Sequence, residues 1–251
     1  MVSDEVSGSF HPAIAGRERS MTELAGTVRR LIDLVVTNTA DSEVLDAVVT
    51  QLQATADILA RNVPTDPVPR FVDPPEDRGS ETRGASMGGS MPYDPVIGRF
   101  NPIALPVTIS FEPPLAIGTA VFTTPYEGGP GWVHGAALAA TFDIVLTAAN
   151  HLSGAAGPTV WLTIRFRRPT LVGVEARFEA EVVANDGRRV TSKGRLVQDG
   201  VVCVEAEGEF AVLSPKKIRK VAERSQRRPA VEPNDADDGA ARADGDGAAP
   251  G

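Results

Sequence analysis

The sequence predicts an α+β fold in which one long apolar helix is covered by a curved antiparallel sheet, preceded by a helical hairpin. Three observations carry this prediction. Between residues 133 and 164 the only formally charged residue is Asp143, as expected for a core helix. The stretches after this helix alternate apolar and polar residues, as half-buried strands do. Two Asp-Gly dipeptides, at 186–187 and 199–200, are typical of hairpin turns.

Residues 1–62 are predicted to form the helical hairpin. One face of its first helix carries four apolar residues at helical spacing, Leu24, Val28, Leu31 and Val35. Ser20 and Glu23 form a capping-box pattern that would start this helix, and the polar residues 37–42 would separate it from a second helix. The hairpin would serve as a lid, as an oligomer contact or as packing.

Two segments lack the apolar periodicity of a folded domain. Residues 63–92 are rich in Pro, Gly, Ser and charged residues, and are predicted to be a linker. Residues 214–251 are predicted to be a disordered charged tail, basic in its first half and acidic in its second. The tail would improve solubility or would contact an anionic surface through its basic half.

Residues 93–213 carry the pattern of the sheet domain. Short β-rich runs at 105–111 and 119–126 precede the long helix, which should start near His134 and end near Ser153-Gly154. The strands of an antiparallel meander are then expected at 160–167, 174–182, 188–198 and 201–213.

Composition narrows the function classes. The chain of 251 residues has 42% hydrophobic and 23% charged residues, which is ordinary for a globular protein. A net charge of -8 gives no support for general nucleic-acid binding. Cys203 is the one cysteine, so no disulfide forms within the chain, which fits a reducing compartment. Residues 1–11 lack the pattern of a signal peptide, and no apolar run is long enough for a stable membrane insertion. We therefore expect a cytoplasmic protein.

Asp143 stands out because its helix is otherwise almost uncharged. An ionised carboxylate is costly to remove from water unless it is paired or hydrogen-bonded, so Asp143 is either structural or catalytic. A helix that is apolar all round must also be covered all round, and a single sheet covers only one side. We therefore expect a second copy of the chain to cover the other side, in a homodimer or homotetramer.

The residues around the start of the helix resemble a family motif. Residues 130–136 read PGWVHGA, and Asp143 follows His134 by nine residues. Thr159 lies ten residues before Pro169, at the end of the stretch TVWLTIRFRRP. This pattern is similar to that of the hotdog-fold acyl-CoA thioesterases of the PaaI-like and THEM4-like type, over about residues 93–213.

The resemblance implies hydrolysis of acyl-CoA thioesters without a metal or a cofactor, since coenzyme A is part of the substrate. The thioester carbonyl would bind at the N-terminal end of the helix, where the N–H groups of Gly135 and Ala136 would stabilise an oxyanion. Asp143 would act as general base or nucleophile. Thr159, expected from the neighbouring subunit, would position water or the carboxylate. His134 is expected to orient the loop at the helix start rather than to carry a proton.

Several further residues have both a functional and a structural interpretation. Arg167 and Arg168 would bind the phosphates of coenzyme A or would lie on a solvated strand face. Trp132 and Trp161 would pack or would line an acyl pocket. Ala136 departs from the family motif, which has a second glycine there, and its added Cβ could change substrate preference or weaken activity.

Competing mechanisms find less support in the sequence. There is no G-x-S-x-G elbow of a serine hydrolase, and the three histidines with one cysteine do not have metal-ligand spacing. The glycine-rich loop lacks the Lys of a phosphate-binding P-loop. The alternative that remains is a hotdog protein that binds an acyl-CoA or acyl-carrier thioester, or serves in assembly, without hydrolysis.

Overall fold

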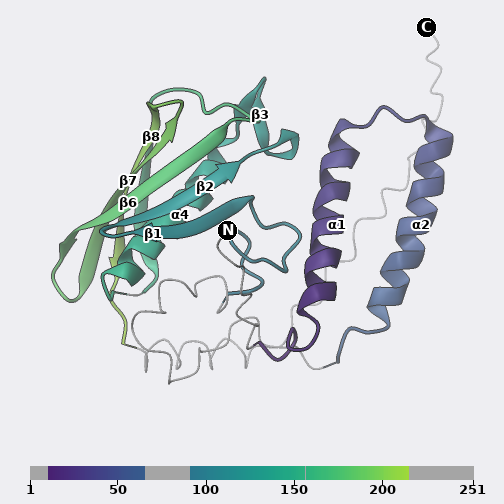
Figure 1. Cartoon of the computed structure of the whole chain (residues 1–251), viewed down its shortest axis with the longest axis horizontal. Coiled ribbons are helices and arrows are strands. Elements are labelled where there is room, and N and C mark those ends of the chain that lie inside the picture. Colours follow the sequence, from purple (N-terminus) through teal and green to yellow (C-terminus); the bar gives the residue numbers. More distant parts are fainter. Residues whose placement is uncertain (1–10, 66–90, 156, 215–251) are drawn as a thin grey trace, which may run out of the picture.

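The computed structural model describes residues 11–65, 91–155 and 157–214. Its elements follow the predicted order (Figure 1). They are α1 (Glu18–Thr37), α2 (Ser42–Ala60), β1 (Val107–Glu112), β2 (Leu115–Val121), the 3₁₀ helix η2 (Thr124–Tyr126), β3 (Glu127–Gly129), β4 (Trp132–Val133), α4 (Gly135–Leu152), β5 (Thr159–Phe166), β6 (Glu175–Asn185), β7 (Arg189–Gln198) and β8 (Val201–Ala211).

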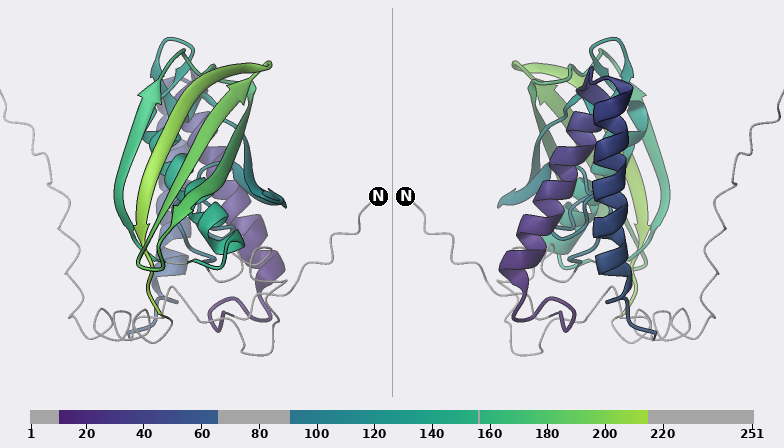
Figure 2. Two further views of the ribbon diagram at one scale, coloured as in Figure 1. Left: turned by 90° about the vertical axis from the view of Figure 1, so that its left-hand side faces the viewer. Right: turned by 90° about the vertical axis from the view of Figure 1, so that its right-hand side faces the viewer.

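Six of the strands form one antiparallel sheet in the order β1-β2-β6-β7-β8-β5, and β3 pairs with β4 in a separate ribbon. The sheet curves round α4, as the left view of Figure 2 shows. This is the predicted α+β architecture, and the helical hairpin precedes it along the chain. Gln198 pairs with Val201 across a tight turn in which Asp199 and Gly200 both have positive φ, as an Asp-Gly hairpin requires.

The core lies between α4 and the concave face of the sheet. Phe142 of α4 meets Phe178 of β6 edge to face, with ring centroids 5.0 Å apart. Leu138, Val145 and Leu146 bury the same face of the helix. Among the described helices, α4 is also the one whose length and composition would suit a membrane span. Its burial against the sheet accounts for this apolar composition, because a core helix needs apolar side chains as much as a membrane helix does.

The hairpin stands beside the sheet domain, with α1 the nearer helix (Figure 1 and Figure 2). α1 contacts η2, and its Ala25 is buried. No residue of α2 is buried, and seven of its large apolar side chains lie at the surface of the described chain, from Val44 to Leu59. The predicted hairpin is therefore confirmed, and α1 is the helix that connects it to the domain.

Several predicted boundaries were wrong, among them the start of the second strand, which lies at Leu115 rather than at residue 119. α1 begins at Glu18 rather than at Ser20, and its N-cap Arg17 makes no capping bond through its side chain. The turn that starts at the buried His11 and Ile14 leads directly into the helix, so the capping box is not used. The second strand ends at Val121 rather than at Tyr126, because Pro125 lies in η2 and cannot donate to a β-ladder. The predicted linker and tail lie almost entirely outside the described residues.

Candidate active site

The N-terminus of α4 is capped by His134. Its Nδ1 accepts a hydrogen bond from the backbone N–H of Ala136 over 3.0 Å, and its carbonyl accepts from Ala137. Its own N–H donates to the carbonyl of Tyr126 over 2.7 Å. The imidazole therefore fills the position that Ser, Asp or Asn usually takes at a helix start. With Nδ1 as the acceptor, any proton on the neutral ring is on Nε2.

The cap separates the two predicted donors. The N–H of Ala136 is bonded to His134, whereas the N–H of Gly135 has no acceptor among the residues that the structure describes. The ring of Phe166 lies against this position, since a Cβ built on Gly135 would be 3.1 Å from its Cζ atom. The free N–H of Gly135 at the positive end of α4 is therefore the better candidate for binding a developing oxyanion.

The loop that leads to His134 is held against its surroundings. Gly128 packs so closely that an added Cβ would be 2.7 Å from the Cα of His134. The N–H of Gly131 donates to the carboxylate of Glu127, and its carbonyl accepts from Val172. Val133 donates to the carbonyl of Thr170. These bonds fix the position of the β3–β4 ribbon, and therefore of the start of α4 that follows it.

Gln198, which was not predicted from the sequence as a site residue, holds the segment that packs against this loop. Its side-chain oxygen accepts from the N–H of Leu171, and its amide group donates to the carbonyls of Leu171 and Val174. Leu171 in turn bridges to Trp132 in the glycine-rich loop. The sequence contained a signal, because Gln198 is a polar residue at an inward-facing position of the alternating series Val190, Ser192 and Leu196. The structure shows that it is buried there and hydrogen-bonded.

Asp143 and Thr159 meet within one chain. The hydroxyl of Thr159, the first residue of β5, donates to Oδ1 of Asp143 over 2.6 Å. The expectation that Thr159 reaches Asp143 from a neighbouring subunit was therefore wrong. Asp143 also is not fully buried. It belongs to a stripe on the side of α4 that the sheet leaves uncovered, with the half-buried Ala139, Ala140 and Thr147 and the exposed Ala136.

The two halves of the predicted site are far apart within one chain. Gly135 and Asp143 are eight residues apart on α4, which corresponds to about 12 Å along the helix axis. A nucleophile and an oxyanion donor must both lie within about 3 Å of one carbonyl group. The structure brings Asp143 to Thr159 and brings His134 to Ala136, but it does not bring these two pairs together in one chain.

Arg167 and Arg168 follow β5 directly after Phe166. Both backbone N–H groups donate to the carbonyl of Cys203, which bends the chain away from β8. The guanidinium of Arg167 is paired with Glu205 over 2.7 Å, whereas Arg168 makes no ion pair with any described residue. Both side chains are exposed.

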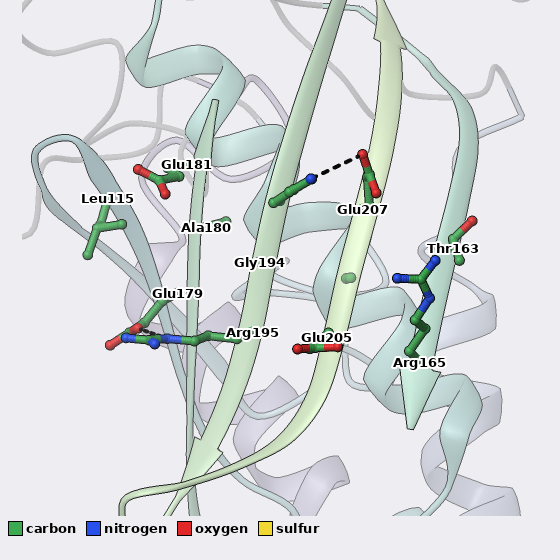
Figure 3. Close-up of a pocket in the computed structure, with 12 residues that line it drawn as sticks. Leu115, Thr163, Arg165, Glu179, Ala180, Glu181, Gly194, Arg195, Glu205 and Glu207 are labelled. Atoms are coloured by element: carbon green, nitrogen blue, oxygen red, sulfur yellow. Dashed lines mark hydrogen bonds and ion pairs between the residues drawn. The ribbon is translucent and has the colours of Figure 1, made fainter. Parts of the chain in front are cut away.

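A hollow lies elsewhere, on the outer face of the sheet. It has a volume of about 480 Å³ and is lined by charged residues of β5 to β8 (Figure 3). Arg195 pairs there with Glu179 and Lys193 with Glu207. None of the predicted site residues lines it. In the described parts of the chain, no group of three or more His, Cys, Asp and Glu side chains could hold a metal ion.

Comparison with known proteins points to one family. The model of the thioesterase superfamily matches residues 130–205, a range that contains His134, Asp143 and Thr159. A crystal structure of a thioesterase superfamily protein is similar with 30% sequence identity and a TM-score of 0.66, over 76% of this chain and 94% of that one. Residues 93–213 are less than half of the chain, so this similarity extends beyond the sheet domain.

Two further solved structures are similar over a smaller part of the chain. The PaaI protein of E. coli, from the phenylacetic acid degradation operon, has 21% identity and a TM-score of 0.42, over 44% of this chain and 81% of that one. Thioesterase superfamily member 2 of Mus musculus has 18% identity and a TM-score of 0.40, over 42% of this chain and 81% of that one. No curated protein matches the chain.

Proposed function

The chain belongs to the thioesterase superfamily, and from this premise we propose that it hydrolyses acyl-CoA thioesters to a free acid and coenzyme A. The observation that carries the proposal is the carboxylate of Asp143, which is held by Thr159 on the uncovered side of an otherwise apolar helix. A purely structural carboxylate would more often be enclosed by its hydrogen-bond partners. Oδ1 is occupied by Thr159, which leaves Oδ2 for the reaction.

Asp143 acts as general base or as nucleophile in this proposal. As a base, its Oδ2 takes a proton from a water molecule while the water oxygen attacks the thioester carbon. As a nucleophile, Oδ2 attacks that carbon itself, and water then hydrolyses the resulting anhydride. In both cases the thiolate of coenzyme A leaves and receives a proton. Thr159 keeps the carboxylate in one orientation by donating its hydroxyl hydrogen.

The negative charge that develops on the carbonyl oxygen is stabilised at the start of α4. The N–H of Gly135 donates to this oxygen, and the positive end of the helix dipole adds to the stabilisation. His134 orients the first turn by accepting the N–H of Ala136, so its role is positional. Arg167 and Arg168, at the end of β5 beside Phe166, bind the phosphates of coenzyme A, with Arg168 the one that carries no ion pair among the described residues.

We further propose that a complete site needs two copies of the chain. The separation of about 12 Å along α4 prevents Gly135 and Asp143 of one chain from acting on the same carbonyl group. A second copy that packs on the uncovered side of α4 would bring its own helix start to the carboxylate of the first. The site would then require the homodimer or homotetramer that the sequence predicts, without a metal or other cofactor. The cytoplasmic location stays a prediction.

A second function is kept open by Ala136, where the family motif has glycine. Its methyl group lies at the start of α4 and is exposed, so it takes space next to the proposed carbonyl position. In this alternative the protein binds an acyl-CoA or acyl-carrier thioester, or serves in assembly, without hydrolysing it. Acyl-CoA would then raise the temperature of unfolding without releasing free thiol.

The proposal is tested by free-thiol release from a panel of short, medium, long and aromatic acyl-CoAs. Wild type should release thiol from at least one class, and Asp143→Ala should lose at least about 100-fold in kcat while its unfolding temperature stays within a few degrees. No release by wild type, together with stabilisation by acyl-CoA, would favour the binding protein. Label found in the carboxylate of Asp143 after a single turnover in ¹⁸O-water would identify a nucleophile, because a general base exchanges no oxygen with the substrate.

A further inference from the structure

Helix α1 contacts the sheet domain at the segment that leads into the candidate site. It contacts η2, the short segment that precedes the β3–β4 ribbon and the cap of α4. α1 and η2 are separated by more than eighty residues along the chain, so their contact is formed only in the folded protein. The hairpin therefore adjoins the loop that carries the proposed oxyanion donor.

Two charged residues of α1, one helical turn apart, attach the helix to the sheet domain. Oδ1 of Asp33 accepts a hydrogen bond from the hydroxyl of Thr123 over 2.7 Å, at the residue before η2. Nη2 of Arg29 donates to three backbone carbonyls of the segment before β1, those of Gly98, Arg99 and Asn101, at 3.2, 2.8 and 2.8 Å. Arg29 thus anchors α1 to this segment, while Asp33 reaches η2.

Tyr126 lies where the two charged residues meet η2. Burial raises the pKa of its phenol, the carboxylate of Asp33 raises it further, and the guanidinium of Arg29 opposes this. Its ring also packs edge to face on the core residue Phe122, with centroids 5.7 Å apart. η2 therefore contacts α1 on one side and the core on the other, through Tyr126.

From η2 a continuous set of bonds leads to the start of α4. The carbonyl of Tyr126 accepts the N–H of His134, and Nδ1 of His134 accepts the N–H of Ala136. Gly128 leaves no free space against His134. A displacement of η2 would thus move the cap, and with it the N–H of Gly135.

We propose that α1 is a positioning element of the hydrolytic site, and that the bond between Asp33 and Thr123 is the link through which it acts. This inference rests on the proposed hydrolysis, because it assigns α1 to the placement of the oxyanion donor. Thr123 is exposed, and an exposed hydrogen bond contributes little to global stability. Removing this hydrogen bond is therefore expected to lower the turnover rate and to leave the unfolding temperature nearly unchanged.

Thr123→Val is the informative variant, because it removes the hydroxyl and keeps the shape of the side chain. Its kcat should fall roughly ten-fold with KM changed less than about two-fold, since the donor is misplaced while coenzyme A still binds. Thr123→Ser keeps the hydroxyl and should restore wild-type kcat. Thr50→Val makes the same chemical change on α2, away from the domain, and serves as the matched control.

Amide hydrogen exchange gives a second measurement that needs no catalysis. In full-length Thr123→Val the N–H groups of His134 and Ala136 should exchange several-fold faster than in wild type, while the amides of β7 and β8 keep their rates. Thr123→Ser and Thr50→Val should match wild type in both regions.

The proposal requires both changes. An unchanged kcat in Thr123→Val, or unchanged exchange at His134 and Ala136, would overturn it. If wild type hydrolyses none of the acyl-CoAs, the proposed function itself fails, and the exchange rates alone then decide whether α1 positions the start of α4. The two failures are therefore distinguishable.

Discussion

The hydroxyl of Thr159 and the carboxylate of Asp143 form the closest contact between predicted site residues, at 2.6 Å. Their spacing in the sequence suggested that both belong to one motif, but only the folded chain shows that they touch. The same holds at the helix start, where Nδ1 of His134 accepts the N–H of Ala136, while the N–H of Gly135 has no acceptor in the described part of the chain. The role of each site residue thus depends on which of its polar groups are already hydrogen-bonded in the folded chain.

Thr159→Val is expected to lower kcat about ten-fold, because the carboxylate of Asp143 loses the donor that fixes its orientation. Thr159→Ser keeps the donor and should retain most of the activity. Steady-state kinetics with the best acyl-CoA substrate measure both variants. Equal activity of Thr159→Val and wild type would show that the orientation of Asp143 does not depend on this bond.

The donor assignment is tested by a pair of substitutions at Gly135. Both Gly135→Ala and Gly135→Pro place a carbon near the ring of Phe166, but only proline removes the backbone N–H. Proline is well tolerated at the first position of a helix, which Gly135 occupies. Gly135→Pro should have a kcat about 100-fold below that of Gly135→Ala. The same loss in both variants would assign the effect to crowding instead.

At the level of elements, the sequence predicted the type and order of the main helices and strands because periodicity is a local property. It misplaced the start of α1, whose capping box at Ser20 is overridden by the buried turn at His11 and Ile14. It also extended β2 past Val121, where the sheet gives way to η2. Both errors arise at ends of elements, where tertiary contacts compete with local signals.

The outer face of the sheet carries a pH-dependent contribution to stability at Glu179. Its carboxylate accepts from Nε of Arg195 at 2.7 Å and from Nε of Arg177 at 3.0 Å, and is only 15% exposed. The bond from Arg195, with a smaller contribution from Arg177, holds its pKa below the ordinary value of 4.5 against the opposing effect of burial. A lowered pKa stabilises the fold fully above about pH 4.5, and this stabilisation is lost as the pH falls through the lowered value.

Glu179→Gln should therefore reduce the free energy of unfolding by about 1 kcal/mol at pH 7 and by progressively less below pH 4.5. Urea unfolding at several pH values measures the difference from wild type. Thiol release should be unchanged at pH 7, since Glu179 lies on the face of the sheet opposite α4. A difference that stays constant down to pH 3 would mean that the charge of Glu179 does not contribute.

At the scale of the whole molecule, the described parts of one chain leave two surfaces beside the candidate site uncovered. The stripe around Asp143 on α4 is half-exposed, and β5 is an edge strand whose Val160, Trp161 and Phe166 are exposed. An edge strand presents unpaired backbone N–H and C=O groups with which another chain can pair. Both surfaces adjoin Thr159, so a second copy that covers them would also close the proposed site.

A mixing experiment tests whether two chains share each site. Asp143→Ala and Gly135→Pro should each be nearly inactive alone, since each lacks one half of every site. In an equal mixture of exchanged subunits, half of the dimers contain one intact site of two, so about a quarter of wild-type activity should return. Activity that does not rise above that of the single variants, after exchange is verified by mass, would contradict a shared site.

The sequence by itself determined the α+β class, the order of the main elements and the positions of the motif residues His134, Asp143 and Thr159. These features follow from periodicity, turn dipeptides and spacing, which neighbouring residues encode. Only the tertiary structure decided that Thr159 bonds Asp143 within one chain, that His134 accepts the N–H of Ala136 rather than that of Gly135, and that α1 meets η2. Such contacts join groups far apart in the chain or depend on the orientation of one side chain. Neither can be predicted from the pattern of neighbouring residues.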